Sequence, residues 1–287
     1  MCNRKSDGRP QKGDCSPRPA FGQQTVTIVP HDEYGRLHGH TPAIVTGKPV
    51  ELGGTAGRVE ATGRGVAIVA QEAARAAGVD LAGARVAVQG FGNVGSHAAE
   101  AFARLGCRVV AVSDVAGAVR NPRGLDVDEL LRRARSGVTG HDGMDVERID
   151  NAELLATDCE VLVPAAVGGV LHEGNADRVR ARLVVEGANV PLTPGADRAL
   201  AERGTIVVPD VLANAGGVIV SYLEWVQNLQ NVRWERAQVD DELSRRLVAA
   251  HRQMWERAAS DGCSLRQAAH RLALSRVAEA ERLRGLA

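Results

Sequence analysis

A glycine-rich turn between two apolar stretches constrains the fold of this chain more than any other feature. Residues 86–95 read VAVQGFGNVG, and an apolar-periodic segment follows at residues 96–105. This order predicts a strand, a phosphate-binding loop and a helix. Gly90 permits the tight turn, Gly92 lets the backbone approach a pyrophosphate, and Gly95 lets the helix pack closely on its strand. The pattern favours a dinucleotide phosphate at the helix N-terminus, although a glycine turn can join any strand and helix.

A carboxylate at the end of the next apolar run strengthens this interpretation. Residues 108–113 predict a second buried strand, and Asp114 follows Gly95 by 19 positions. That distance matches the roughly 20 residues between the glycine motif and the carboxylate that binds the adenosine ribose hydroxyls. We therefore predict that Asp114 holds the ribose. NAD is expected in preference to NADP, because a carboxylate repels a 2′-phosphate.

Alternating apolar runs and helical patterns predict an α/β fold with a doubly wound, mostly parallel sheet of the Rossmann type. Further strands are expected at residues 160–166, 183–189 and 205–210, and helices at residues 60–77, 127–135, 152–157 and 194–202, with a polar loop at 136–150. Residues 215–287 are expected to be almost wholly helical, with interruptions near Asn231 and Gly262.

Composition divides the chain into three parts. Residues 1–30 are rich in Arg, Lys, Gly, Pro and Ser, so an unstructured tail is expected there, with one strand-like run at residues 25–29. Residues 31–230 form the expected dinucleotide-binding domain, and residues 231–287 the expected C-terminal helices. An apolar stripe along these helices includes Leu243, Leu247, Val248, Met254, Trp255, Leu265, Leu272, Leu274 and Val277. We expect this stripe to be exposed and to bind a second copy or a partner, unless the helices fold back onto the chain's own core.

Charge and residue usage argue against several classes of function. Lys plus Arg and Asp plus Glu both number 35, so the net charge is zero and nothing favours nucleic acid or an anionic membrane. No apolar run approaches the roughly 18 residues of a membrane span, and the first residues lack the apolar core of a signal peptide. A cytoplasmic protein is therefore expected. The five cysteines and eight histidines show no disulfide framework or metal-ligand spacing, so no bound metal is expected.

Eight short motifs occur in unbroken order along the chain. They are VTGKP at 45–49, ELGG at 51–54, EATGRG at 60–65, QGFGNVG at 89–95, VEGAN at 185–189, LANAGGV at 212–218, SYLEWVQN at 221–228 and RVAEA at 276–280. Through these motifs the sequence resembles the Glu/Leu/Phe/Val dehydrogenase family over about residues 32–285, and most closely its glutamate dehydrogenases. The resemblance implies oxidative deamination of L-glutamate to 2-oxoglutarate and ammonia, with hydride transfer to a nicotinamide cofactor.

The resemblance also implies roles for individual residues. The residues expected to cradle the pyrophosphate are Gly90, Gly92, Asn93, Val94 and Gly95, and Asp114 is expected to hold the ribose. Thr62 and Asn214 are expected at the nicotinamide end, and Ala165, Ala166 and Asn189 are expected to line the cofactor cleft. Ser221 matches the residue that binds the side-chain carboxylate of glutamate. Each role has an alternative: Thr62 can stand near a helix start, the asparagines can be turn residues, and Ser221 can bond back to a helix carbonyl.

No residue of this chain matches the catalytic lysine of the family. In the family that lysine and a proton-shuttling aspartate belong to a preceding substrate domain, whereas the lysines here are Lys5, Lys12 and Lys48. Lys48 belongs to the segment that leads into the nucleotide-binding domain, and we expect it to be structural.

Two classes of function stay open. One is the cofactor-binding part of an amino-acid dehydrogenase, acting on an amino acid and its 2-oxo acid, either as a homo-oligomer or with a separately encoded substrate domain. The other is a non-catalytic dinucleotide-binding module or an inactive fragment.

Overall fold

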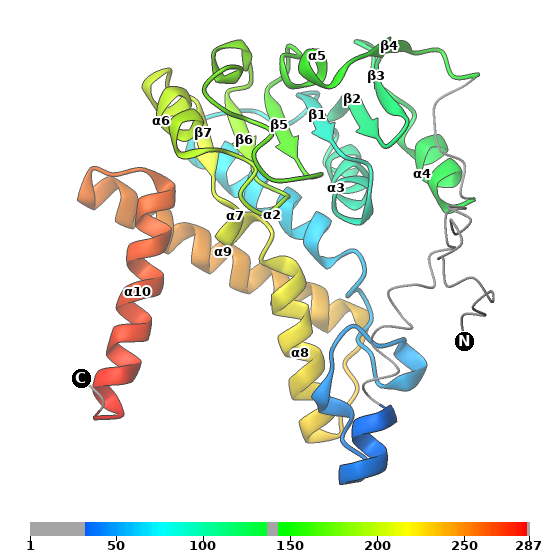
Figure 1. Cartoon of the computed structure of the whole chain (residues 1–287), viewed down its shortest axis with the longest axis vertical. Helices are drawn as coiled ribbons and strands as arrows, with labels where there is room; N and C mark the ends of the chain where they lie inside the picture. Colours follow the sequence, from blue (N-terminus) through cyan, green and yellow to red (C-terminus); the bar gives the residue numbers. More distant parts are fainter. Residues whose placement is uncertain (1–31, 137–142, 286–287) are drawn as a thin grey trace, which may run out of the picture.

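The computed structural model describes residues 32–136 and 143–285, which form a central sheet flanked by helices (Figure 1). The expected tail at residues 1–30, with its strand-like run at 25–29, lies outside the described residues. Two 3-10 turns, η1 (Pro42–Ile44) and η2 (Val50–Leu52), precede the long helix α2 (Ala61–Ala76).

Seven strands form one sheet in the order β4-β3-β2-β1-β5-β6-β7. They are β1 (Arg85–Gln89), β2 (Arg108–Asp114), β3 (Gly117–Arg120), β4 (Glu147–Ile149), β5 (Val161–Pro164), β6 (Leu183–Val185) and β7 (Ile206–Val208). The pairs from β2 through β1 to β7 are parallel, whereas β3 and β4 pair antiparallel at one edge. The expected doubly wound, mostly parallel sheet is confirmed, and its strand order reverses between β1 and β5.

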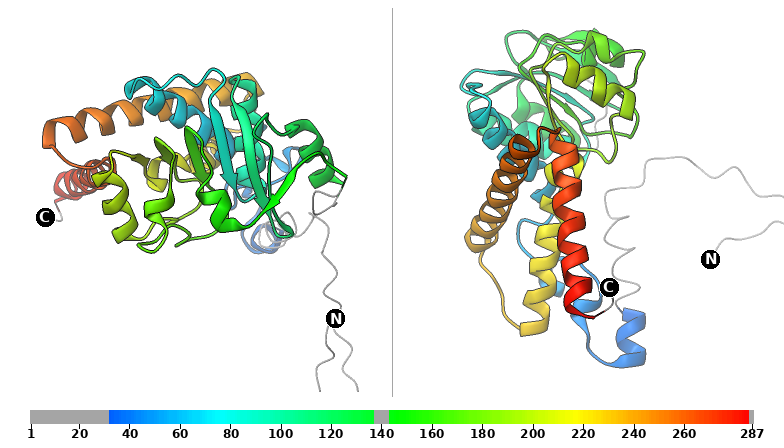
Figure 2. Two further views of the ribbon diagram at one scale, coloured as in Figure 1. Left: turned by 90° about the horizontal axis from the view of Figure 1, so that it is seen from above. Right: turned by 90° about the vertical axis from the view of Figure 1, so that its left-hand side faces the viewer.

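Both faces of the sheet are buried, because successive residues of a strand point to opposite faces and both sets are apolar. In β1, Val86 and Val88 join the core on one face, and Ala87 joins the core on the other. Helices α2 and α3 (Asn93–Arg104) cover the first face. Helices α5 (Asn151–Leu155) and α6 (Pro194–Glu202) cover the second, so the sheet lies between two helical layers (Figure 2).

Helix boundaries follow local capping signals. The helix α4 (Val127–Arg135) begins after Asp126, whose side chain accepts a hydrogen bond from a backbone amide of the first turn. α5 begins after Asp150, which forms a capping box with Glu153, and α6 begins after the cap Thr193. The bounds expected for α4 and α6 are confirmed at both ends.

One edge of the sheet differs from the expectation. The polar loop expected at residues 136–150 is wrong at its end, because β4 occupies Glu147–Ile149, and β3 has no counterpart among the expected strands. The Arg120 guanidinium binds the Glu147 carboxylate across these two strands at 2.8 Å. β4 is the edge strand, and edge strands are commonly short and polar. β3, its neighbour, has only two buried apolar residues, so no apolar run marked either strand in the sequence.

Three helices complete the chain: α8 (Gly216–Gln230), α9 (Arg236–Asp261) and α10 (Leu265–Leu283). Both expected interruptions are confirmed, since Asn231 and Gly262 end α8 and α9 in the left-handed conformation with φ of 52° and 59°. No helix within residues 32–136 and 143–285 is long and apolar enough to cross a membrane.

The apolar stripe of the C-terminal helices divides into two parts. Leu243, Leu247 and Met254 of α9 are buried, and α9 packs against α2. The expected exposure is therefore wrong for α9, which folds back onto the chain's own core because α2 offers it an apolar face. On the distal half of α10, Leu274 and Val277 leave 69% and 62% of their surface exposed. The exposed part of the stripe thus lies on α10.

Candidate functional site

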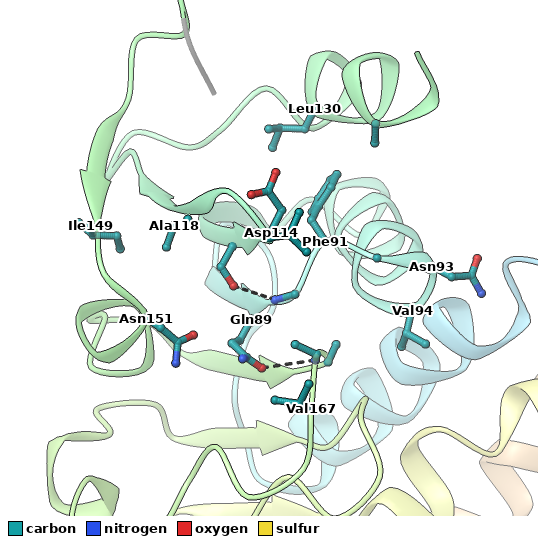
Figure 3. Close-up of a pocket in the computed structure, with 18 of the residues that line it drawn as sticks. Gln89, Phe91, Asn93, Val94, Asp114, Ala118, Leu130, Ile149, Asn151 and Val167 are labelled. Carbon is teal, nitrogen blue, oxygen red and sulfur yellow. Dashed lines mark hydrogen bonds between the residues drawn. The ribbon is translucent and has the colours of Figure 1, made fainter. Parts of the chain in front are cut away.

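A cavity of about 1010 Å³ opens at the carboxyl edge of the sheet, where β1, β2 and β5 end (Figure 3). Seven residues singled out from the sequence border it: Gly90, Gly92, Asn93, Val94, Asp114, Ala165 and Ala166. Ligands of open α/β sheets bind at this edge, beside the point where the strand order reverses. We call this space the cofactor cavity.

Glycines shape the turn from β1 into α3. Gly90 has a φ of 95°, which a residue with a side chain rarely adopts. A Cβ atom at Gly95 would lie 1.7 Å from the Gly90 carbonyl oxygen, so α3 approaches β1 this closely only because residue 95 has no side chain. A Cβ atom at Gly92 would have no neighbouring protein atom within 4 Å. The turn is therefore crowded on the protein side and open at Gly92.

Hydrogen bonds join the three strand ends that border the cavity. The Gly90 amide donates to Ser113 Oγ at 2.9 Å, which ties the turn to β2. The Gln89 carbonyl accepts from the Ala165 amide at 2.7 Å, and the Gln89 side chain accepts from the Ala166 amide at 3.4 Å, which tie β1 to β5. Figure 3 draws the Ser113 and Gln89 side-chain bonds as dashed lines. These bonds hold the walls in place before any ligand arrives.

Helix α3 presents its amino end to the cavity. Gly92 is its N-cap, and Asn93 and Val94, its first two residues, line the space. The first amides of a helix have no intrahelical acceptors and carry a partial positive charge, so they attract a phosphate. The Asn93 side chain donates to the Val59 carbonyl at 3.0 Å, which fixes this turn to the segment before α2.

Asp114 ends β2 and borders the same cavity. Its Oδ1 atom accepts a hydrogen bond from the Ala116 amide at 2.7 Å, which orients the carboxylate. Arg133 of α4 also borders the cavity and binds Glu129 through Nε at 2.7 Å. Sequence reasoning missed Arg133, because nothing in the pattern of α4 shows which face of that helix meets the strand ends.

Asn189 and Asn214 form a hydrogen-bonded pair beyond the walls of the cofactor cavity. Asn214 Nδ2 donates to Asn189 Oδ1 at 2.7 Å. A Cβ atom at Gly187 would lie 2.9 Å from the Ala165 Cβ. The loop that carries Asn189 therefore packs beside the β5 end of the cavity, and the structure brings the two asparagines together there.

Thr62 lies where the amino ends of three helices meet. A Cβ atom at Gly217 of α8 would lie 2.4 Å from Thr62 Oγ1, and one at Gly63 would lie 2.5 Å from the Val94 carbonyl oxygen of α3. Thr62 thus stands between the start of α3 and the start of α8.

Ser221 lies one turn further along α8 and has a partner that sequence reasoning missed. Arg58 Nε donates to Ser221 Oγ at 2.8 Å. Burial lowers the pKa of the Arg58 guanidinium, and the Glu224 carboxylate opposes that shift. An arginine four residues before Thr62, in the same glycine-rich segment, was the available signal. Ser221 also borders a second, smaller cavity together with Thr46 and Trp225.

Lys48 is held in a buried ion pair. Its Nζ atom lies 2.6 Å from Glu224 Oε1, and the two side chains are 1% and 0% exposed. Lys48 Nζ also donates to the Val45 carbonyl at 2.6 Å, and Glu224 Oε2 accepts from the Gly47 amide at 2.8 Å. These contacts fasten the segment before α2 to α8, which supports a structural role for Lys48.

The fold and the cavity define a Rossmann-type α/β protein with a preformed space at the carboxyl edge of its sheet. The chain belongs to the Glutamate/Leucine/Phenylalanine/Valine dehydrogenase family, whose model matches residues 53–285. The members of this family are oxidoreductases that use a nicotinamide cofactor.

Relatives of known identity cover most of this chain, but the chain spans less than two thirds of their length. Glutamate dehydrogenase of Thermotoga maritima is 51% identical over 257 residues, which are 89% of this chain and 62% of the relative. The hetero-hexameric glutamate dehydrogenase of Thermus thermophilus, solved with leucine bound, has a TM-score of 0.86 at 42% identity, over 92% of this chain and 63% of the other. Glutamate dehydrogenase of Peptoniphilus asaccharolyticus has a TM-score of 0.80 at 35% identity, with the same coverage.

Proposed function

We propose that this chain is the cofactor-binding part of an NAD-dependent glutamate dehydrogenase, which converts L-glutamate to 2-oxoglutarate and ammonia. The observation that carries the proposal is the cofactor cavity, which Gly92 and Asp114 border from the ends of adjacent strands. The similarity to enzymes named as glutamate dehydrogenases supports the reaction.

The residues around the cavity fit a dinucleotide. The amino end of α3 would bind the pyrophosphate in the space open at Gly92, and the Asp114 carboxylate would accept hydrogen bonds from the adenosine ribose. Thr62 and the Asn189–Asn214 pair would hold the nicotinamide end, beyond the wall formed by Ala165 and Ala166. The nicotinamide ring, when bound, supplies the hydride acceptor, and the protein supplies position and electrostatics.

The charges at the cavity favour NAD over NADP. Asp114 would repel a 2′-phosphate, whereas Arg133, which also borders the cavity, would attract one. Arg133 already binds Glu129, which reduces that attraction. Arg120 of β3 pairs with Ala111, three residues before the end of β2, and binds Glu147. The acidic group therefore decides the preference.

Arg58 and Ser221 favour an acidic substrate. The guanidinium and the hydroxyl lie 2.8 Å apart on the face of α8 that adjoins Thr62, and together they offer a positive charge and donors to a carboxylate. The nearby Glu224 carboxylate is already paired with Lys48, so an acidic substrate side chain would supply this partly buried guanidinium with a countercharge of its own. We therefore propose glutamate as the substrate class.

A non-catalytic dinucleotide-binding module is the second candidate, and Lys48 favours it. Within residues 32–136 and 143–285, Lys48 is the one lysine, and its amine is buried against Glu224. No described lysine amine is therefore available to a substrate near Ser221. Turnover would then require groups from another domain or polypeptide, such as a separately encoded substrate domain. The exposed Leu274 and Val277 of α10 are candidate contacts for it.

Calorimetric titration of the full chain with NAD, NADP and ADP-ribose tests the proposal. We expect NAD to bind at least about tenfold more tightly than NADP, a difference of about 1.4 kcal/mol. Asp114→Ser should narrow this preference, and Asp128→Ser, which alters an acidic residue of α4 outside the cavity walls, is the control. A folded chain that binds none of the three up to millimolar concentration would contradict the proposal.

A further inference from the structure

Arg266, in the first turn of α10, reaches from the C-terminal helices into the body of the sheet. Its Nη2 and Nη1 atoms donate to the two oxygens of Glu186 at 2.6 and 3.1 Å, and its Nε atom donates to Asp197 Oδ2 at 3.1 Å. A third carboxylate is close as well, since Asp210 Oδ1 lies 3.7 Å from Nη1. Figure 1 shows the start of α10 near α6, which carries Asp197. Glu186 directly follows β6, and Asp210 begins the short helix α7 (Asp210–Ala213) after β7.

Glu186 requires a positively charged partner, because its side chain is completely buried. Burial raises the pKa of its carboxyl, and Arg266 opposes that shift. A buried carboxylate that loses its cation is left uncompensated, which is strongly unfavourable. Glu186 Oε2 also accepts the Asp210 amide at 2.7 Å. Arg266 therefore holds Asp210 in place by two routes, directly and through Glu186.

Asp210 in turn holds both members of the Asn189–Asn214 pair through their backbone. Its Oδ2 atom accepts from the amide of Val190, the residue after Asn189, at 2.7 Å. Its carbonyl accepts from the amide of Asn214 at 3.0 Å. One residue thus fixes the backbone on each side of the hydrogen bond between the two asparagines.

The backbone at Val190 is strained, which indicates that the hydrogen bond to Asp210 helps to hold this conformation. Val190 has a φ of 47°, a left-handed conformation that is unfavourable for a β-branched residue. Its side chain is 63% exposed, so burial does not compensate. Such strain persists only where the surroundings enforce it. Here the enforcing contacts are the bond to Asp210 and the bond from the Gly169 amide to the Val190 carbonyl at 2.9 Å.

We propose that Arg266 is a positioning residue, which acts through Glu186 and Asp210 to fix the Asn189–Asn214 pair where the nicotinamide end of the cofactor binds. This inference rests on the proposed function, because it assigns that end of the dinucleotide to the pair. It makes the first turn of α10, more than fifty residues after Asn214, part of the cofactor site. The C-terminal helices then affect cofactor geometry without touching the cofactor.

Binding of NAD and of ADP-ribose, which lacks the nicotinamide, separates positioning from general stability. For Arg266→Gln in the full chain we expect NAD to bind about tenfold more weakly, as for loss of a hydrogen bond, while ADP-ribose affinity changes by less than about twofold. Asp210→Ala should have the same effect, and it leaves the Arg266–Glu186–Asp197 contacts in place if Arg266→Gln does not fold. Arg85→Gln is the matched control. Arg85 also binds two carboxylates, Asp158 and Glu160, but it does so at the amino ends of β1 and β5, away from the cofactor cavity.

A second measurement reads the asparagine pair without any ligand. The side-chain amide resonances of Asn214 in a ¹⁵N-¹H spectrum should shift in Arg266→Gln and Asp210→Ala but not in Arg85→Gln. Equal losses of NAD and ADP-ribose affinity, an unmoved Asn214 resonance, or a wild-type chain that binds NAD no more tightly than ADP-ribose would each overturn the inference. A wild-type chain that binds neither nucleotide would instead contradict the proposed function.

Discussion

The cofactor cavity and the cluster formed by Lys48, Arg58, Ser221 and Glu224 on α8 are built in opposite ways. The cavity turn comes from one continuous stretch of chain and relies on backbone amides and missing side chains, as at Gly95. The α8 cluster joins residues 163 and 176 positions apart, and it relies on buried charges. We call this second group the α8 cluster.

The difference determines what each region tolerates. The glycine turn is disrupted when a side chain is added, because there is no room for it. A buried ion pair is destabilised when one charged partner is removed, because the remaining charge is left buried and unpaired. The following changes test this contrast.

Lys48→Met should have the largest effect on stability. It leaves the Glu224 carboxylate buried without its cation, so we expect a loss of about 3–5 kcal/mol in the free energy of unfolding. Urea unfolding followed by circular dichroism measures it. NAD affinity under conditions where the variant is folded should be unchanged.

Two controls accompany this change. Lys48→Met combined with Glu224→Gln removes the stranded charge and keeps an acceptor for the Gly47 amide, so most of the loss should be recovered. Arg104→Met breaks an exposed ion pair with Glu100 and should cost no more than about 0.5 kcal/mol. A loss below about 1 kcal/mol for Lys48→Met would mean that the pair does not hold the α8 cluster together.

Gly95→Ala and Gly92→Ala should separate folding from binding in the cofactor cavity. The added methyl group at Gly95 collides with the Gly90 carbonyl, so we expect a loss of about 1–3 kcal/mol in stability together with weaker NAD binding. The methyl group at Gly92 meets no protein atom, so stability should hold while NAD binding weakens. Thermal unfolding and calorimetry measure the two effects. If Gly92→Ala binds NAD as tightly as the wild type, the pyrophosphate does not approach that residue.

His251 should produce the smallest effect, visible only as a pH dependence. It is buried on α9, and no hydrogen-bond partner reaches its Nε2 atom within the described part of the chain. Burial lowers its pKa below 6.5, and Glu72 opposes the shift. Because the folded state resists protonation more than the unfolded state, stability should be full above about pH 6.5 and fall as the pH drops below it.

The variant His251→Phe keeps a ring beside Trp255 and removes the titration. The difference in unfolding free energy between wild type and variant, measured from pH 8 to pH 5, should therefore change only in the acidic part of that range. A difference that stays constant with pH would show that His251 titrates alike in both states.

Patterns within short stretches predicted much of this molecule correctly. The apolar runs marked the parallel strands, the helical patterns marked the bounds of α4 and α6, and Asn231 marked the end of α8. These signals depend on neighbours in the chain, so no partner from elsewhere is needed to interpret them. β3 and the edge strand β4 escaped because each has too few apolar residues to form a recognisable run, so only their pairing defines them.

The candidate site shows the same division. The sequence by itself determined the glycine turn, the strand ends and the placement of Asp114, because these follow from spacing along one βαβ unit. Only the tertiary structure decided that Arg58 meets Ser221, that Lys48 is buried against Glu224, and that Arg266 reaches Glu186. Long polar side chains have no periodic pattern, and their partners are set by how distant helices pack. The glycine turn is therefore encoded locally, whereas Lys48, Arg58 and Arg266 acquire their partners only when α8 and α10 are in place.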